Sequence, residues 1–317
     1  MNEGVIEVSA DDYHAETFSD VPMLSSSIAK ILLSKSPKHA HQAHPKLGGR
    51  PVEELEADEQ KRKIMDRGTI AHAILLEGRS DLMVIVNPED YRSKPNKANP
   101  DGAIPKGWTN NAIKERRDDI REQGKIAMLP NEANHVMRMV EEAKRFMRED
   151  CQEPILRDIF ETGSPESTII WQESGAWTKA RLDLVTHDWR AVLDYKTTFN
   201  ASPGAFGRQI ASMDYHIQAE LYSRGVERLK GRRPAWFFLA QEPLPPYSCS
   251  LHGLSNAYMD IAASSVTEAA QTWASCLASG KWPGYGGQTH YAEPAVWQLQ
   301  KHMERGEIED PFKDEYK

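Results

Sequence analysis

The sequence predicts an α/β fold in which one mixed sheet is flanked by helices, with a helical elaboration at the N-terminus. Three segments rich in apolar and β-branched residues, 167–172, 176–185 and 191–196, follow one another with short polar links, as consecutive antiparallel strands do. The run 235–240, Ala-Trp-Phe-Phe-Leu-Ala, is apolar throughout and is typical of a central strand. Helical spacing of apolar residues around these segments predicts the flanking helices.

The N-terminal region is predicted to contain two short helices. The first covers about 25–33, where Ser25 or Ser26 supplies an N-cap side chain. The second begins at Pro37, because proline is well tolerated at the first helical position.

A longer helix is predicted to follow. It begins at Val52 or Asp58, runs to Leu76 and closes at Gly78, since glycine readily adopts the left-handed conformation that ends many helices. Residues 82–86 are a candidate short strand.

The middle of the chain is predicted to be a loop followed by helices. Residues 88–108 contain four prolines and no apolar periodicity, so a long loop is expected there. Helices are expected over 109–123 and 131–148. The predicted organisation is therefore an N-terminal helical segment 1–60, a core 61–286 that includes this loop, and a polar C-terminal tail 287–317.

The segments after the three strands are predicted to complete the sheet and to add helices that pack on it. Residues 198–207 are polar and contain glycine, so a loop beside the functional site is expected. A helix over 210–229 leads into the central strand, and residues 247–251 are placed to pair with that strand. A last long helix covers 256–279 and ends near Gly280.

Bulk properties indicate an ordinary globular protein. The chain has 317 residues, 39% of them hydrophobic and 27% charged, enough to bury one large core or two small ones. No apolar run approaches the length of a membrane span, and the N-terminus lacks the features of a signal peptide. We therefore expect no membrane partner.

The three cysteines, Cys151, Cys249 and Cys276, are odd in number and widely spaced. This pattern predicts neither disulfide bonds nor a zinc or iron–sulfur site. The expected compartment is a reducing cytoplasm.

A predicted hairpin over 181–196 carries two carboxylates and an ammonium group. If the hairpin is symmetric about its polar turn, 187–190, Asp183 and Asp194 lie directly opposite each other, with Cβ atoms roughly 5 Å apart. Lys196 is two residues beyond Asp194, so strand alternation directs its side chain to the same face.

Such a face is suited to a hard divalent cation and an attacking water. Carboxylate oxygens are the ligands that Mg²⁺ and Mn²⁺ prefer, and a cation relieves the repulsion between Asp183 and Asp194. The cation also offsets the negative charge that builds up when water attacks a phosphodiester. Lys196 is placed to orient the water or to stabilise that charge. The alternative is a surface hairpin with a cross-strand pair of Lys and Asp.

Two other features bear on this site. His72 interrupts an apolar helical stretch, where it is either a buried core residue or a ligand. Gln218 and Tyr222 are four residues apart and share one face of a predicted helix.

In combination, these residues resemble a known family. Their order is similar to that of the RecB-like branch of the PD-(D/E)XK nucleases, and most similar to the exonuclease VIII (RecE) type of phage and prophage nuclease. The residues that carry the resemblance are Gly68-Thr-x-x-His72, Asp183, Asp194-x-Lys196 and Gln218-x-x-x-Tyr222. Leu182 precedes Asp183 where the family name has proline.

Both ends of the chain extend the resemblance to about residues 12–286. The N-terminal part contains Tyr13-His14, the run 24–30 and Ser36-Pro37. The C-terminal part is Trp282-Pro-Gly-Tyr. The resemblance implies the fold of a PD-(D/E)XK nuclease.

The resemblance also implies roles for the site residues. His72, Asp183 and Asp194 are the expected metal ligands, with the carbonyl of Tyr195 as a further one. Lys196 is the expected catalytic lysine.

Three residues have a less specific expected role. Gln218 and Tyr222 match positions that support the site or contact DNA. Glu166 matches an acidic position that opens the first core strand, where it is either catalytic or a solvated strand end.

The function implied by the resemblance is an Mg²⁺-dependent exonuclease, for which Mn²⁺ is a substitute. It digests linear double-stranded DNA from 5′ to 3′ and leaves 3′ single strands for recombination by strand annealing. A ring-shaped homo-oligomer, a single-strand annealing protein as partner, and a phage or prophage origin within a bacterial cytoplasm are also implied. The alternatives are a single-strand or structure-specific nuclease and a non-catalytic DNA-end-binding protein.

The net charge of −8 contrasts with a role in binding DNA, because phosphates are contacted by Lys and Arg. Basic residues nevertheless gather within 30–39, 61–67 and 94–106, and acidic residues within 53–59 and 307–315. These groups are either solvated faces or an acidic exterior around a basic path for DNA, as the resemblance implies.

Overall fold

The computed structural model describes residues 1–48 and 59–305. The chain forms two compact units, Met1–Trp282 and Pro283–Lys317. The predicted helix start at Val52 or Asp58, most of the acidic run 53–59 and the acidic tail 307–315 lie outside the described residues. The domain boundaries expected from the sequence stay a prediction.

The larger unit is built on a six-stranded mixed sheet with the order β1-β4-β5-β6-β7-β8. Neighbouring strands are antiparallel except β6 and β7, which are parallel. The predicted mixed sheet is therefore confirmed, with β1 as a strand that the sequence did not indicate. The strands are β1 Gly4–Ile6, β4 Ser164–Glu173, β5 Ala176–Val185, β6 Ala191–Thr197, β7 Ala235–Gln241 and β8 Cys249–His252.

Local sequence explains the antiparallel strands β4, β5 and β6. The β4–β5 link is two residues, Ser174 and Gly175, with φ of 50° and 85°. Positive φ at both positions is what a tight hairpin turn needs, because its twist then matches that of the strands. The β6–β7 pair is parallel because a helical crossover separates the two strands in sequence.

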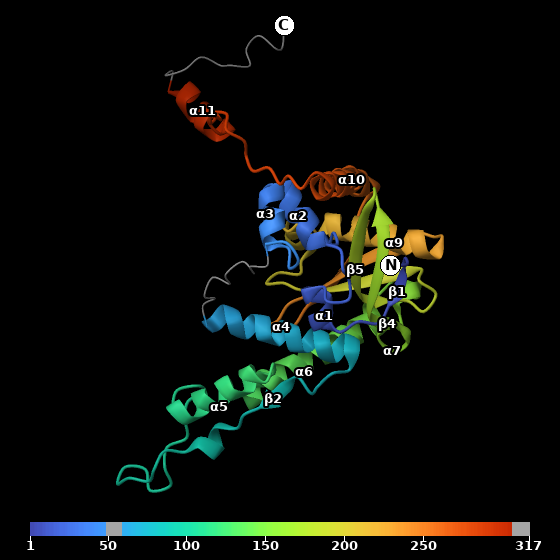
Figure 1. The fold of residues 1–317 in the computed structure, drawn as a ribbon. Helices are drawn as coiled ribbons and strands as arrows, with labels where there is room; N and C mark the ends of the chain where they lie inside the picture. The colour runs from blue at the N-terminus through green and yellow to red at the C-terminus, as the bar shows by residue number, and fades with distance from the viewer. Residues whose placement is uncertain (49–58, 306–317) are drawn as a thin grey trace. The chain divides into compact units, whose positions relative to one another are not determined.

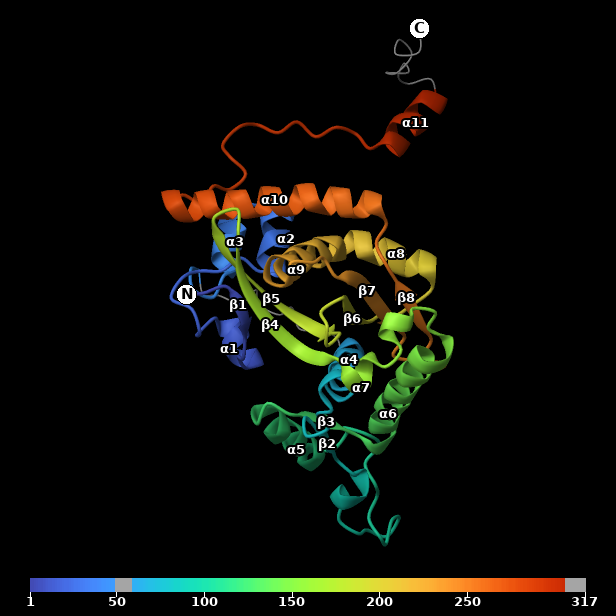
Figure 2. The ribbon, with the colours of Figure 1, turned by 90° about the vertical axis from the view of Figure 1, so that its right-hand side faces the viewer.

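Helices cover both faces of the sheet, as Figures 1 and 2 show. One core lies between the sheet and α2, α3, α8, α9 and α10, and contains the fully buried Trp171 and Trp273. A second core on the opposite face joins the sheet to α4, α6 and α7. These helices are α2 Ser26–Ser34, α3 Pro37–Ala43, α4 Glu59–Glu77, α6 Pro130–Arg145, α7 Ile159–Thr162, α8 Pro203–Ser212, α9 Tyr215–Lys230 and α10 Asn256–Ser279.

A small subassembly holds the segment between α4 and α6. Strands β2, Met83–Ile85, and β3, Ile126–Met128, form a parallel pair. Helix α5, Asn111–Glu122, packs beside them around its own apolar cluster. Within the intervening loop, the described structure is a 3-10 turn over Pro88–Tyr91 and irregular backbone.

Most predicted helices are confirmed. Ser25 caps α2 by accepting a hydrogen bond from the backbone N–H of Ile28. Pro37 opens α3. Glycines with positive φ follow α4 and α10 at Gly78 and Gly280. Helix α6 is followed by a π-helical turn over Phe146–Asp150.

One predicted helix was wrong in its extent. The expected helix over 210–229 is two helices, α8 and α9, separated at Met213 and Asp214. Asp214 has a φ of 51°, which no α-helical residue adopts, so the chain changes direction there. Helix α8 begins at Pro203, within the stretch predicted to be a loop. Helix α1, Ala10–Ala15, in the larger unit and helix α11, Val296–Glu304, in the smaller unit were not predicted.

Among the described residues, no helix is both long and apolar enough to cross a membrane.

Candidate active site

Three carboxylates occupy neighbouring positions on three adjacent strands. Residues on both sides of Glu166 in β4 pair with residues on both sides of Asp183 in β5. The β5–β6 ladder ends at the pair Leu184–Leu193, so the next position in the same register places Asp183 opposite Asp194. The predicted hairpin register is confirmed. We call Glu166, Asp183 and Asp194 the carboxylate row.

Glu166 interrupts the ladder at this point. Its φ of 48° is left-handed, which is uncommon for a residue other than glycine. Strained backbone of this kind persists where the surroundings hold it, and it gathers at functional sites. An ion pair from Arg181 holds Oε2 of Glu166, which leaves Oε1 facing His72.

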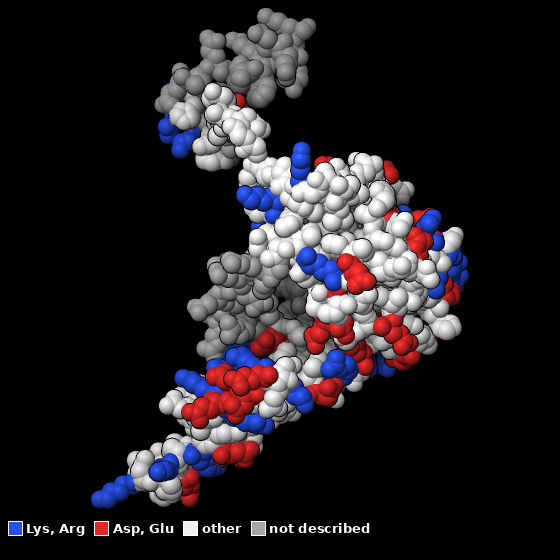
Figure 3. Space-filling view, viewed as in Figure 1, with Lys and Arg blue, Asp and Glu red and all other residues white. Residues whose placement is uncertain are grey.

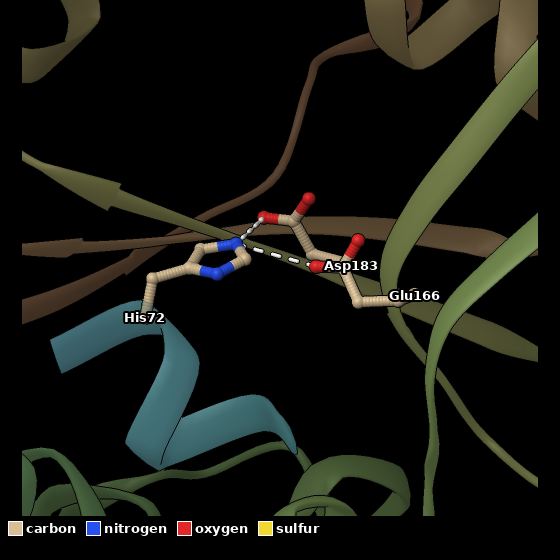
Figure 4. Close-up of side chains that lie close together, drawn as sticks. All are labelled: His72, Glu166 and Asp183. Carbon is tan, nitrogen blue, oxygen red and sulfur yellow. Dashed lines mark ion pairs between the residues drawn. The ribbon is translucent and has the colours of Figure 1, made fainter. Parts of the chain in front are cut away.

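Helix α4 brings His72 to the carboxylate row (Figure 4). The His72 Nε2 atom lies 3.4 Å from Asp183 Oδ2 and 3.7 Å from Glu166 Oε1. Gly68, one turn earlier, permits this approach, because a Cβ there would lie only 2.7 Å from the Thr197 Oγ1 atom. With 30% of its side chain exposed, His72 faces the carboxylates and not the apolar core.

Asp194 is held by two partners. Gln218 on α9 donates a hydrogen bond from Nε2 to Asp194 Oδ2 at 2.6 Å, and the Lys196 ammonium forms an ion pair with Oδ1. The neighbouring carboxylate of Asp183 accepts a hydrogen bond from the backbone N–H of Tyr195 at 3.0 Å. Both carboxylates are thus oriented by β6 and α9 before any ligand is bound.

Two predicted residues have other contacts. The hydroxyl of Tyr222 lies 3.2 Å from the Ser26 hydroxyl in the buried interface of α9 with α2. The hydroxyl of Tyr195 donates to Gln241 Oε1. Tyr222 therefore joins α9 to α2, and its role in the site stays a prediction, as does the carbonyl of Tyr195 as a ligand.

Crowding of acids shifts the pKa values in the carboxylate row. Burial and the charge of Asp183 raise the pKa of Asp194 from 3.8 to about 6. Burial, together with Asp183, also raises the pKa of Glu166 against the opposing effect of Arg181. Burial acts in the same direction on Asp183, but His72 and Lys196 outweigh it and lower the pKa of that carboxyl.

The two bases are shifted toward their charged forms. Burial alone would lower the pKa of His72, but its hydrogen bond to Asp183 and the nearby acids raise it above 6.5. Burial also opposes the charge on Lys196, yet Asp194 and Asp183 raise the pKa of its ammonium. The acids of the site thus hold both bases in their charged forms.

His72, Glu166 and Asp183 fit a divalent cation. Each offers one ligand atom, and these three atoms all lie within 4.8 Å of one another. One imidazole nitrogen and two carboxylate oxygens are suitable donors for Mn²⁺ or Mg²⁺. Asp194 lies outside this group, with Lys196 and Gln218 as its partners, and its role as a ligand stays a prediction.

Comparison with known proteins adds a family to this geometry. The family described as "PDDEXK-like domain of unknown function (DUF3799)" matches residues 25–294. The chain belongs to this family. PD-(D/E)XK nucleases use divalent metals, and the matched range contains the carboxylate row, His72, Lys196 and Gln218. No curated protein matches the chain.

A solved structure has a similar fold. It is a protein of Eubacterium rectale described as a "putative exonuclease", with 12% sequence identity and a TM-score of 0.55. The similarity covers 93% of this chain and 98% of that one. Together with the DUF3799 match, this fold supports a nuclease of the PD-(D/E)XK type.

The position of Glu166 could have been found from the sequence. The hairpin that joins β4 to β5 is symmetric about Ser174 and Gly175, and this symmetry places Glu166 opposite Asp183. Ser-Gly is a recognisable two-residue hairpin turn. The same argument that paired Asp183 with Asp194 would therefore have extended the row to Glu166.

Proposed function

We propose that this DUF3799 protein is a metal-dependent DNA exonuclease that hydrolyses linear double-stranded DNA. The observation that carries the proposal is the carboxylate row facing His72, with Lys196 beside it. Attack from an end is supported by the similarity to the described exonuclease. The 5′ to 3′ direction and the production of 3′ single strands for annealing rest on the resemblance to the exonuclease VIII type.

The proposed metal ligands are His72, Glu166 and Asp183, with Asp194 as a fourth. A divalent cation, Mg²⁺ or Mn²⁺, supplies a bound water of lowered pKa and offsets the charge of the phosphodiester. Gln218 keeps the Asp194 carboxylate oriented by its hydrogen bond.

Lys196 contributes a fixed positive charge to the reaction. Because the acids around it raise the pKa of its ammonium, Lys196 is protonated at neutral pH. Its ion pair with Asp194 holds that charge beside the carboxylate row, where an attacked phosphate would gain negative charge. Lys196 therefore stabilises the charge that develops during hydrolysis.

The surface does not carry a uniform charge. Figure 3 shows Lys and Arg interspersed with Asp and Glu over the helices below the sheet in this view. On a mixed surface of this kind, DNA is expected to bind through particular basic residues near the site. Attraction by one broad basic face is not expected.

The test is digestion of a 5′-phosphorylated linear duplex beside a covalently closed circle, with Mg²⁺ and with a chelator. We expect only the linear DNA to disappear, and only when metal is present. Lys196→Ala should abolish this loss, whereas Lys114→Ala, a matched change at an exposed position of α5, should retain it. Cleavage of the circle would indicate an endonuclease, and binding without turnover would indicate a DNA-end-binding protein.

Metal binding can be measured apart from activity. A cation that binds only the folded protein stabilises it by about 2.7 kcal/mol at 100 times its dissociation constant. We expect Mn²⁺ or Mg²⁺ to raise the melting temperature of the wild-type protein and not that of His72→Ala. Equal shifts in both proteins would exclude His72 as a ligand.

The proposed partners are a second copy of the chain, in a ring, and a single-strand annealing protein. Both rest on the resemblance to the exonuclease VIII type. Light scattering after size-exclusion chromatography tests the ring, and a monomer at micromolar concentration would contradict it.

A further inference from the structure

A second lysine reaches the aromatic ring over which Lys196 lies. Lys30 is on α2, and its Nζ atom lies 5.2 Å from the centroid of the Tyr215 ring. The Nζ atom of Lys196 lies at the same distance from that centroid. The two ammonium groups are therefore no farther apart than twice this distance, although α2 and β6 are remote in sequence.

The Tyr215 ring is a fixed platform that both lysines contact. It packs against Phe206 and Phe238, with ring centroids 6.1 Å and 5.8 Å away. Its hydroxyl accepts a hydrogen bond from Gln209. Contact with an aromatic face is favourable for each ammonium, so both charges are held in place.

Lys30 differs from Lys196 in having no carboxylate partner. Lys196 is paired with Asp194. Within residues 1–48 and 59–305, the polar contact of the Lys30 ammonium is a hydrogen bond of 3.0 Å to the carbonyl of Met213, and no ion pair is found. Burial and the charge of Lys196 lower the pKa of Lys30 to about 8. The Lys30 ammonium is a half-buried cation that the charges of Asp194 and Asp214 influence without forming an ion pair with it in the described part of the chain.

An anion that enters this position would relieve the repulsion between the two lysines. The proposed function supplies one, since DNA carries a phosphate at every nucleotide. An ammonium group binds phosphate as a point charge and needs no special orientation.

We propose that Lys30 binds a phosphate of the DNA strand that occupies the active site, beside the phosphate position served by Lys196. This inference rests on the proposed nuclease function and adds a substrate contact from α2. Lys30 then holds the strand in place. Its contact with the phosphate is the same in the bound substrate and in the transition state.

The direct test is Lys30→Met, which removes the charge and keeps most of the side-chain length. Binding of a fluorescent linear duplex is measured by anisotropy, with Ca²⁺ in place of Mg²⁺, over a range of salt concentrations. One lost phosphate contact should lower the slope of log affinity against log salt by about 0.9. KM should rise about 10-fold with little change in kcat, because the contact is made equally in the ground and transition states.

Two further variants separate a local contact from general charge and from packing. Lys30→Arg keeps the charge and should restore the salt slope. Lys35→Met removes an exposed charge from the end of the same helix and should leave the slope unchanged. An equal loss in Lys35→Met would overturn the proposal in favour of diffuse surface charge. A lower kcat with an unchanged slope would overturn it in favour of a structural role through Met213.

The wild-type protein provides a test that needs no variant. Amine acylation followed by peptide mapping should modify Lys30 in the free protein and much less in the DNA complex, whereas Lys114 should react equally in both. Equal modification of Lys30 in both states would overturn the inference. A wild-type protein that neither binds nor cleaves DNA would overturn the proposed function as well, whereas cleavage with an unchanged salt slope in Lys30→Met overturns the Lys30 contact alone.

Discussion

Two ionic groups in the larger unit contain the same kinds of side chain but differ in their number of carboxylates and in their exposure to solvent. The first, which we call the Glu16 cluster, consists of Glu16, His44 and Lys179. The Glu16 Oε2 atom lies 2.7 Å from the Lys179 ammonium and 3.4 Å from His44 Nε2. The second is the carboxylate row with His72 and Lys196.

The Glu16 cluster is buried and contains more bases than acids. One carboxylate faces two bases, and its other oxygen accepts a hydrogen bond from the backbone N–H of Met23 at 2.8 Å. Lys179 donates a further hydrogen bond to the carbonyl of Tyr13. The Glu16 side chain is completely buried. Through these contacts, the cluster joins the ends of α1 and α3 to β5 as a structural brace.

The carboxylate row is rich in acids and accessible, and His72, Lys196 and Arg181 are its basic partners. Three carboxylates share the site, and the side chains of Glu166 and Asp183 are 17% and 16% exposed. The pKa values of Glu166 and Asp194 are raised, whereas that of Glu16 is lowered. Converging carboxylates with access from solvent indicate a site that takes up a cation, whereas a buried carboxylate paired with two bases indicates a brace.

The largest effect is expected from Asp183→Asn, which should remove the central ligand of the row. Loss of several kcal/mol of metal-derived stabilisation corresponds to a fall in rate on the order of 1000-fold. The measurement is initial-rate digestion of linear duplex. Asp188→Asn, the same change in the exposed turn of the hairpin, is the control. Near-normal activity of Asp183→Asn would show that the carboxylate row is not the active site, and the difference in role between the two groups would no longer hold.

Lys179→Met should affect stability and not chemistry. It leaves the Glu16 carboxylate buried without its closest partner, which costs about 3–5 kcal/mol of unfolding free energy. Urea unfolding measures this loss, with Lys114→Met as an exposed control. At a temperature where the variant is folded, its kcat should equal that of the wild type. A change below about 1 kcal/mol would show that the cluster is no brace.

Asp194 and Glu16 should make opposite contributions to the pH dependence of stability. The pKa of Asp194 is about 6 in the folded protein and 3.8 for a free aspartate, which represents the unfolded chain. Between these two pH values, and without metal, the folded protein keeps a proton on Asp194 that the unfolded chain releases. The unfolding free energy then falls as pH rises from 3.8 to about 6, by on the order of 3 kcal/mol. Burial would raise the pKa of Glu16, but His44 and Lys179 lower it below 4.5, so its contribution is present above pH 4.5 and lost as pH falls.

Urea unfolding in chelator at several pH values tests both directions. Relative to the wild type, Asp194→Asn should lose the decline between pH 3.8 and 6, and Glu16→Gln should lose the decline at acid pH. Variant curves that run parallel to the wild-type curve would contradict these assignments.

The smallest effect is expected from Gln218→Ala. Gln218 orients Asp194 without carrying charge, and partners of this kind typically contribute about 10–100-fold to activity or metal affinity. Gln218→Glu is a second variant for comparison, because it adds a fourth acid to the site. Its activity should be lower than that of Gln218→Ala unless the metal is in excess. The measurement is the Mg²⁺ concentration that gives half-maximal digestion. An unchanged value in both variants would show that Gln218 contributes to packing and does not orient Asp194.

Local patterns predicted the strands and the register well, and they predicted the helix junctions less well. The β5–β6 register follows from a short turn and strand alternation, which depend on neighbouring residues. The break at Asp214, where φ is 51°, has no comparable local signal, because aspartate occurs inside helices as well as at positive φ. Helix propensity alone therefore predicted one continuous helix.

The sequence by itself determined the antiparallel strands β4 to β6, the pairing of Asp183 with Asp194 and the placement of Lys196 on their face, because all three depend on short turns and on alternation along strands. Only the tertiary structure decided that His72 meets Asp183 and Glu166, since this requires α4 to pack closely against β6 at Gly68. The same holds for Lys30, which reaches the Tyr215 ring from α2. Contacts between elements far apart in the chain depend on how helices pack on the sheet, and no local pattern encodes that packing.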